Sequence, residues 1–398
     1  MLSFGKFLLE QTDPEEGASR QIKHLTHVED RALQTGEKGA LRSISSLKAT
    51  AEHIASGKKT SELTTKYDGS PAIVYGRHPD NGKFFVASKS AFNKTPKINY
   101  TPQDIERNHG HAPGLVEKLK HALKHLPKVT PNEGVYQGDM MFSPEDKKTS
   151  KTGSVSFNPN PSGLTYTAHG DLGKKAKKAQ IGVVTHLKYE GKDSGNLNAS
   201  HEVDHENFNE HPDVFTVDPQ MDTAKVHFGP KERAEFKKHL AAAEEVHNTH
   251  GDDMYAGTKL HHGIGGHLEA YMNHTVRSGE VPNHQNFKNW LEGKKTKEID
   301  KLKVEKNRNA RQEELRNELN KIETNKKHYN NLFKLHKHLQ NAKNVLINVM
   351  NQHQQFQHQH AGENANPEGY VFHHKNDTDK LVNRQEFSKR NFEGIRNI

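Results

Sequence analysis

The chain has 398 residues and a formal net charge of +8, and this length suits one large domain or two ordinary ones. It contains no cysteine, which excludes disulfides, thiolate metal sites and cysteine nucleophiles. Only 31% of its residues are apolar and its mean hydropathy is −1.00, so we expect part of the chain to be solvated or thinly packed.

No run of about 18 apolar residues occurs, so the sequence predicts no membrane span. The opening segment Met1–Leu9 is too short and too interrupted for the apolar part of a signal peptide. We therefore expect a soluble, cytoplasmic protein, in the host cytoplasm if the source is viral.

The first half of the chain alternates between helical and strand patterns. Residues 18–56 carry apolar side chains at helical spacing, as do residues 115–126. From Leu63 to Ser90 the period changes to two, and Pro79-Asp80-Asn81-Gly82 separates two apolar runs in the manner of a β-hairpin. Further strands are expected at residues 134–142, 164–168 and 181–189.

Between about residues 223 and 362 the pattern is helical. Apolar residues recur there at near-heptad spacing, at Leu332, Leu335, Leu339, Leu346 and Val349. This stripe favours packing against a neighbouring helix, such as the one that contains Leu315, Leu319 and Ile322. We therefore expect a helical hairpin inserted between two parts of another domain.

The positive charge is concentrated in one stretch. From Lys294 to Lys343 there are 15 Lys or Arg against 7 Asp or Glu, which leaves the rest of the chain nearly neutral. A local excess of cations favours a polyanionic partner such as nucleic acid, because neutralising phosphates releases counterions. The alternative is a solubilising face on a long helix.

The most informative motif is Lys66-Tyr67-Asp68-Gly69, at the mouth of the expected hairpin. A lysine between apolar strand residues, followed by an acid, is a candidate for covalent chemistry at its amine. A lysine nucleophile has to lose its proton near pH 7, roughly three units below the usual pKa of about 10.4, and burial or nearby cations can achieve this. The alternative for this motif alone is a solvated turn.

Four segments, in order, resemble motifs of the covalent nucleotidyltransferases, the superfamily of ATP-dependent DNA and RNA ligases and mRNA capping enzymes. Lys66–Ser70 resembles motif I, whose lysine attacks the α-phosphate of ATP or GTP. Val135-Tyr136-Gln137-Gly138-Asp139 resembles motif III, Glu368-Gly369-Tyr370-Val371 resembles motif IV, and Lys380-Leu381-Val382 resembles motif V.

The chain departs from the family pattern at three places. DNA ligases usually have an arginine just after motif I, where this chain reads Ser70-Pro71-Ala72. Lys89 stands where ligases commonly have arginine in the next motif, with Arg77 as the reserve candidate. Motif III usually ends in glutamate, and here the acid is Asp139. These departures affect substrate choice more than nucleotide chemistry.

The resemblance implies that Lys66 is the catalytic nucleophile and carries the nucleotide as a lysyl-AMP. Attack on a phosphate passes through a charged, in-line transition state, which needs cations and oriented donors more than a base. By resemblance, Lys380 would supply a cation at the α-phosphate, and Lys89 would supply a second one.

The same resemblance implies different roles for the acidic residues of the motifs. Glu368 would help to hold a divalent ion, and Asp139 would contact the ribose or orient a water molecule of the metal. Asp68 and Gly69 would shape the nucleotide-binding loop after the nucleophile. Carboxylate oxygens of this kind suit magnesium, so ATP and Mg²⁺ are the expected cofactors.

Some residues outside the motifs are weaker candidates. Tyr166 or His186 could form one side of an adenine site, and Arg384 could touch a terminal phosphate or make a surface salt bridge. The Gln/His-rich run that contains His353, His358 and His360 fits a polar loop or helix end better than a transition-metal site.

The expected fold is α+β, with an antiparallel β-sheet nucleotidyltransferase domain of the ligase adenylation type and a large helical insertion. The domain would comprise residues 1–222 with motifs I and III and residues 363–398 with motifs IV and V, separated by the basic helical insertion 223–362. The chain ends 18 residues after Lys380, which leaves no room for the OB-fold of DNA ligases and capping enzymes.

The predicted activity is therefore ATP-dependent sealing of nucleic-acid ends through lysyl-AMP, with RNA ends favoured. The alternatives are a DNA nick ligase, a non-catalytic nucleic-acid-binding or virion protein on a ligase-like fold, and nucleotide transfer to a protein or small molecule. The opening Phe4–Glu10 also resembles the start of many large tailed-phage proteins. The choice between ATP and GTP stays open.

Overall fold

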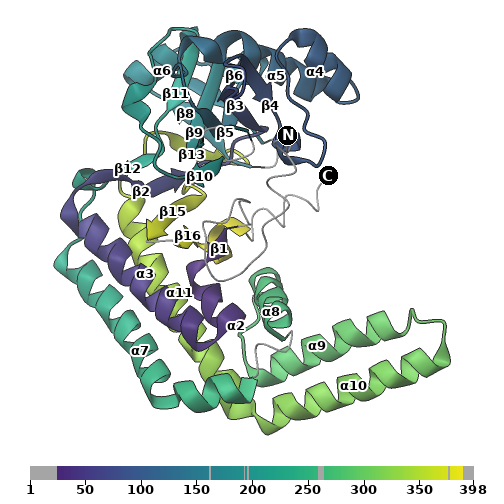
Figure 1. The fold of residues 1–398 in the computed structure, drawn as a ribbon. Coiled ribbons are helices and arrows are strands. Elements are labelled where there is room, and N and C mark those ends of the chain that lie inside the picture. The colour runs from purple at the N-terminus through teal and green to yellow at the C-terminus, as the bar shows by residue number, and fades with distance from the viewer. Residues whose placement is uncertain are drawn as a thin grey trace. The chain divides into compact units, whose positions relative to one another are not determined.

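The computed structural model describes residues 25–160, 163–191, 193–194, 197–258, 264–374 and 377–388, and the chain is α+β with mainly antiparallel sheets (Figure 1). It divides into two compact units. Of the described residues, the sheet unit contains Leu25, 59–222 and 353–378, and the helical unit contains 26–58, 223–352 and 379–388.

The central sheet of the sheet unit has the strand order β10-β9-β5-β3-β4, and β11 adds to β9 in parallel. Its strands are β3 (Ala72–Arg77), β4 (Phe84–Ala87), β5 (Val135–Phe142), β9 (Ile181–Glu190), β10 (Asn198–Ser200) and β11 (Val214–Val217). Gly82, at φ 66°, closes the turn between β3 and β4, so the expected hairpin is confirmed.

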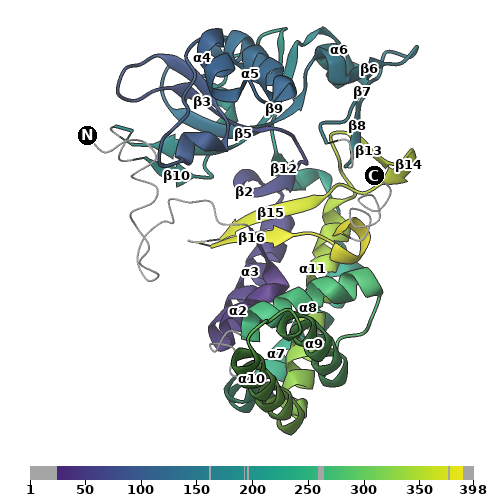
Figure 2. The ribbon, with the colours of Figure 1, turned by 90° about the vertical axis from the view of Figure 1, so that its right-hand side faces the viewer.

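Two helices, α4 (Pro102–His109) and α5 (Pro113–His125), cover one face of this sheet (Figure 2). Leu119 of α5 is fully buried in the same apolar cluster as Ile73 and Val86 of the sheet. The alternating apolar positions of the strands and the helical spacing of α5 therefore meet in one core, as the sequence patterns predict.

Two smaller groups of strands complete the sheet unit. In the first, β2 (Lys59–Lys66) pairs with β12 (Gln220–Asp222) on one side and antiparallel with β15 (Gly369–His374) on the other. The second has the order β14-β13-β8-β7-β6. Its strands are β6 (Lys147–Thr149), β7 (Val155–Phe157), β8 (Thr165–Ala168), β13 (Gln357–His360) and β14 (Glu363–Ala365). The short helix α6 (Gly170–Lys178) packs beside β7 and β8.

An aromatic cluster fills the space between strands of the sheet unit. The Tyr67 ring lies 5.9 Å from that of Tyr166 and 5.8 Å from that of Phe356, and Phe157 stacks on Tyr166 at 5.7 Å. All four rings are buried, and such pairs stabilise a core beyond the area they bury. The residue directly after Lys66 is thus anchored in the core.

The helical unit is built from α2 (Arg31–Thr35), α3 (Glu37–Ser56), α7 (Pro230–Thr258), α8 (Ile264–Ser278), α9 (His284–Ile299), α10 (Glu305–Thr324) and α11 (Lys326–Met350). Helix α11 packs most extensively along α7, whereas α10 packs along α9. The expectation that the α11 stripe packs on α10 is therefore wrong, since α11, in which Leu335 and Leu339 are buried, packs chiefly on α7.

The segment expected to be helical from residue 18 begins differently. Residues 18–24 lie outside the described part, Thr26–His27 form the short strand β1, and a 3-10 turn follows at Val28–Asp30. Strand β1 pairs in parallel with β16 (Asp377–Leu381). Gly36, at φ 61°, separates α2 from α3.

Charged side chains are buried together in the helical unit. Lys343 Nζ lies 2.5 Å from Glu29 Oε1, and Asp30 accepts hydrogen bonds from His336 and Arg384 at 2.9 Å. Burial alone would raise the pKa of the two acids, but the adjacent cations hold the pKa of Glu29 and of Asp30 below its usual value. Lys343 therefore belongs to the core and not to a basic surface.

No helix in the described ranges is both long enough and apolar enough to cross a membrane.

We predict that Lys343→Met lowers the free energy of unfolding by about 3–5 kcal/mol, because it leaves the Glu29 carboxylate buried without its cation. Urea unfolding of the full chain measures this. Lys337→Met, on the exposed side of the same helix, is the matched control and should change stability little. The double variant Glu29→Gln/Lys343→Met should recover much of the loss, and an undiminished loss there would contradict the assigned ion pair.

Acid should destabilise the sheet unit through His358, which is 4% exposed and packs on Tyr166 at 5.2 Å. Burial lowers its pKa from 6.5 to about 4. The unfolded chain therefore takes up the proton first, and stability is lost as the pH falls from 6.5 toward 4.

His358→Phe should reduce the loss of unfolding free energy between neutral pH and about pH 4.5 by about 2–3 kcal/mol. Urea unfolding at the two pH values tests this, with His360→Phe at a half-buried position of the same strand as the control. An equal acid sensitivity in His358→Phe and wild type would refute the assignment.

Candidate active site

Lys66 is the last residue of β2, and the strand register places it opposite Gly369, the first residue of β15. Glu368 precedes β15 directly, is 6% exposed, and forms an ion pair through Oε2 with Lys66 Nζ. Lys66 was expected at the mouth of the hairpin, but it ends a separate strand, because the alternation that buries Leu63 and Thr65 ends at Lys66 and β3 begins only at Ala72.

The aromatic core supports the loop after Lys66. The backbone N–H of Asp68 donates to the Tyr166 hydroxyl at 2.8 Å, and its carboxylate accepts from Asn160 Nδ2 at 3.2 Å. Tyr166 is 1% exposed. It therefore supports the loop and has no free ring face for an adenine, contrary to one of our expectations.

The same loop lies against β5. A Cβ atom on Gly69 would come within 2.5 Å of Asp139 Cβ and 3.0 Å of the Met140 carbonyl oxygen. Ser70 also donates its backbone N–H to the Met140 carbonyl at 2.9 Å. Glycine at position 69 is thus required by close approach, and this approach brings the acid of the motif III segment beside the Lys66 loop.

Three carboxylates and two lysines influence one another here. Burial raises the pKa of Asp139, whereas His186, Lys66 and Lys89 oppose the shift and Glu368 adds a smaller increase. Burial also raises the pKa of Asp68, again with Glu368 adding to it and Lys66 opposing it. The acids therefore outnumber the cations, and a positively charged ligand would stabilise the group.

One histidine stands next to Asp139, and two others interact electrostatically with that histidine. His186 Nδ1, on β9, lies 3.9 Å from Asp139 Oδ2. The rings of His201 and His373 stack at 3.7 Å, and the Thr378 hydroxyl lies 3.0 Å from His373 Nδ1. Burial lowers the pKa of His186, that of His201 to about 4, and that of His373 to about 2. The two stacked rings are thus neutral near pH 7.

Sequence reasoning singled out only His186 of these three. The chain has 30 histidines, and neither His201 nor His373 stands in a recognisable motif. His201 directly follows β10 and His373 lies on β15, which is far from it in the chain, so local spacing carried no signal for their stacking.

The carboxylates fit a magnesium ion that is bound partly through water. Within the described residues, the one group of three or more acids and histidines with ligand atoms all within 4.8 Å of one another is Glu29, Asp30 and His336, whose acids are already paired with cations. Asp139 and Glu368 are therefore not a closed cage. Magnesium usually keeps several waters and uses one or two carboxylates plus phosphate oxygens.

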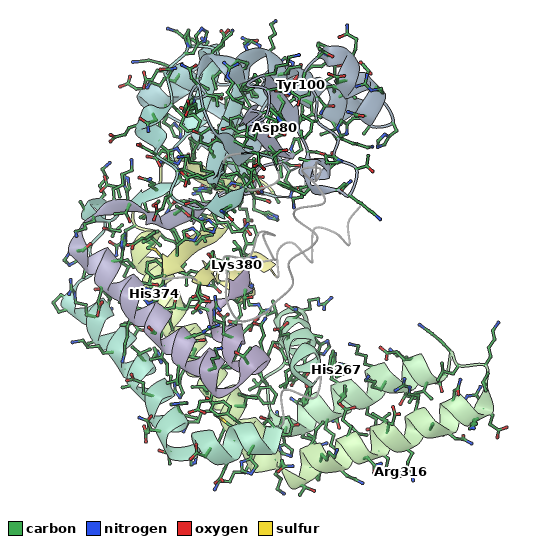
Figure 3. The ribbon with its side chains drawn as sticks, in the orientation of Figure 1. Asp80, Tyr100, His267, Arg316, His374 and Lys380 are labelled. Atoms are coloured by element: carbon green, nitrogen blue, oxygen red, sulfur yellow. The ribbon has the colours of Figure 1, made fainter. Side chains whose placement is uncertain are left out.

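Three further candidate residues belong to other elements of the fold. Lys380 is on β16 in the helical unit, where it pairs with His27 of β1 (Figure 3). Arg384 is 4% exposed and donates to Asp30 and to Asn273, so it is a buried structural residue and not a surface one. Arg77 packs over the Phe84 ring at 5.4 Å, at the end of β3 remote from Ala72.

The chain belongs to the family of unknown function DUF6267, whose model matches residues 22–396. No curated protein and no solved structure matches the chain. The family description states no activity.

We predict that Gly69→Ala lowers the free energy of unfolding by about 1–3 kcal/mol, because its methyl group would overlap Asp139 and Met140. Gly114→Ala is the matched control, since Gly114 lies in the first turn of α5 and has nothing within 4 Å of the added Cβ. It should be neutral or slightly stabilising. Equal stabilities of the two variants in urea unfolding would refute the close approach of the loop to β5.

Proposed function

We propose that the chain is an ATP-dependent nucleotidyltransferase of the ligase type, built on an adenylation-type domain, which seals nucleic-acid ends through a lysyl-AMP. The observation that carries this proposal is the ion pair between Lys66 and Glu368. These residues belong to the segments that resemble motifs I and IV, and they meet although 302 positions separate them in the chain. Asp139, of the segment that resembles motif III, lies beside the same loop.

In the proposed first step, a bond forms between Lys66 Nζ and the α-phosphorus of ATP while the bond to the pyrophosphate oxygen breaks. Pyrophosphate leaves with the electron pair of that bond. The amine loses a proton, and the Glu368 carboxylate is the base in contact with it. The product is a phosphoramidate on Lys66.

A magnesium ion, when bound, would neutralise the charge of the phosphates and of the leaving group. Asp139 and Glu368 would hold it, which agrees with the excess of acids over lysines at the site. Lys89, the first residue of a 3-10 turn after β4, would add a cation on the side of Asp139.

In the later steps, the 5′-phosphate of a nucleic-acid strand would take AMP from Lys66, and a 3′-hydroxyl would then attack this phosphate and release AMP. The resemblance favours RNA ends over nicked DNA. Nucleotide transfer to a protein or a small molecule would share the first step alone.

Incubation of the full chain with α-labelled ATP and magnesium, followed by a denaturing gel, tests the first step. Prior treatment with pyrophosphate removes any AMP already carried. We expect an acid-labile label on wild type and none on Lys66→Arg, which keeps the charge but lacks the nucleophilic amine. Lys59→Arg makes the same change at the other end of β2, where the lysine pairs with Asp218, and should be labelled like wild type.

Label on folded Lys66→Arg, or none on wild type with ATP or GTP, would overturn the proposal and favour a non-catalytic binding protein. If label forms, comparison of labelled RNA ends with nicked duplex DNA as acceptors distinguishes RNA sealing from DNA sealing.

A further inference from the structure

The basic stretch of the chain is not one continuous surface in the helical unit. Helices α9 and α10 lie side by side as a hairpin (Figure 1), and the turn between them spans residues 300–304. Residues 294–311 at the turn end contain eight Lys or Arg and three Asp or Glu, a net charge of +5. Residues 312–325, further along α10, have a net charge of −2. Within the α9–α10 hairpin the positive charge is therefore concentrated at the hairpin tip, residues 294–311.

Four lysines of the hairpin tip are exposed and make no ion pair with any described residue: Lys297, Lys301, Lys303 and Lys306. Along the body of α10 the pattern is different. Arg316 pairs with Glu313 at 3.1 Å (Figure 3), and Arg311, at the edge of the tip, pairs with Glu314. A solubilising surface normally mixes charges of both signs, as the body of α10 does.

The positions of these lysines are unfavourable for the stability of helix α10. Lys303 and Lys306 flank the first turn of α10, where the helix dipole favours acids and disfavours cations. The N-cap residue is Val304, which is 56% exposed and provides no side-chain cap for the first backbone N–H groups. Binding of anionic groups beside this turn would offset both costs.

The composition of the hairpin tip indicates what kind of anion it would bind. No aromatic residue occurs between Lys294 and Arg311, so the tip has no ring on which a base could stack. Arg308 donates Nη2 to the Leu302 carbonyl and Arg311 is paired with Glu314, so the lysines are the available cations. Lysines act as point charges on phosphates and do not distinguish bases.

We propose that the hairpin tip binds the phosphate backbone of nucleic acid without sequence preference. The assignment of nucleic acid as the class of partner rests on the proposed function, whereas the presence of the cationic surface does not. The α9 helix has 16 residues and is therefore about 24 Å long, so the tip offers this charge at the end of a long arm of the helical unit.

The test compares two full-chain variants that carry the same change in net charge. In the tip variant, Lys297, Lys301, Lys303 and Lys306 are replaced by Gln. In the control variant, four exposed lysines on other helices of the same unit are replaced by Gln: Lys38, Lys231, Lys237 and Lys238. Fluorescence anisotropy measures their binding to labelled single-stranded RNA and DNA oligonucleotides of several sequences at a series of KCl concentrations.

We expect the tip variant to bind every oligonucleotide at least about tenfold more weakly than wild type, and the slope of log affinity against log salt to fall by about 3. The control variant should bind like wild type. Equal weakening in both variants would show an effect of net charge alone and would overturn the proposal. Wild-type affinity in the tip variant would also overturn it.

Two further readouts complete the experiment. Self-labelling with α-labelled ATP should be the same in wild type and tip variant, so a loss of nucleic-acid binding is separated from a failure of the proposed lysine chemistry. Vesicles of phosphatidylserine and phosphatidylcholine serve as a second anionic probe. Lysine-dependent binding to these vesicles, with no binding to the oligonucleotides, would assign the hairpin tip to a lipid surface and overturn the proposal.

Discussion

The pairing of β2 with β15 is the constraint on which the candidate site depends. Its register sets Lys66 opposite Gly369, and so brings Glu368 to the lysine amine. A slip of one residue would turn every side chain of β2 to the other face and would remove Leu63 from the core. The backbone ladder and the anchored Tyr67 ring together hold the register, so the position of the Lys66 amine is fixed by core packing and not by a flexible loop.

Each unit contains a cluster of charged side chains, but the ratio of acids to cations differs between the two clusters. In the helical unit, two acids and two strong cations are matched, as in the contact of Lys343 with Glu29. At the Lys66 loop, three acids face two lysines, and the pKa of Asp139 and that of Asp68 are raised. A matched group is complete without a ligand, whereas an unmatched one has a strong electrostatic preference for a cation. This difference separates a structural cluster from a candidate site.

Local periodicity was sufficient to predict much of the sheet unit. The strands around Val74, Asp139 and Val184 and the helix around Leu119 lie where alternation and helical spacing place them. Which helices, strands and side chains pack against one another was not predictable in this way, because such packing depends on contacts between distant segments. The packing of α11 on α7, the burial of Lys343 against Glu29, and the stacking of His201 on His373 are all of this kind, so they leave no pattern in a short window of sequence.

The division of the chain into units has a consequence for how the protein is made. Between Thr26 and Ser388 the chain crosses from one unit to the other four times. The sheet unit is incomplete until β15 has left the ribosome, and the helical unit is incomplete until Arg384 has done so. Neither unit can therefore complete its fold before these late segments are made, and a single proteolytic cut at one crossing would leave the two units covalently joined through the other crossings.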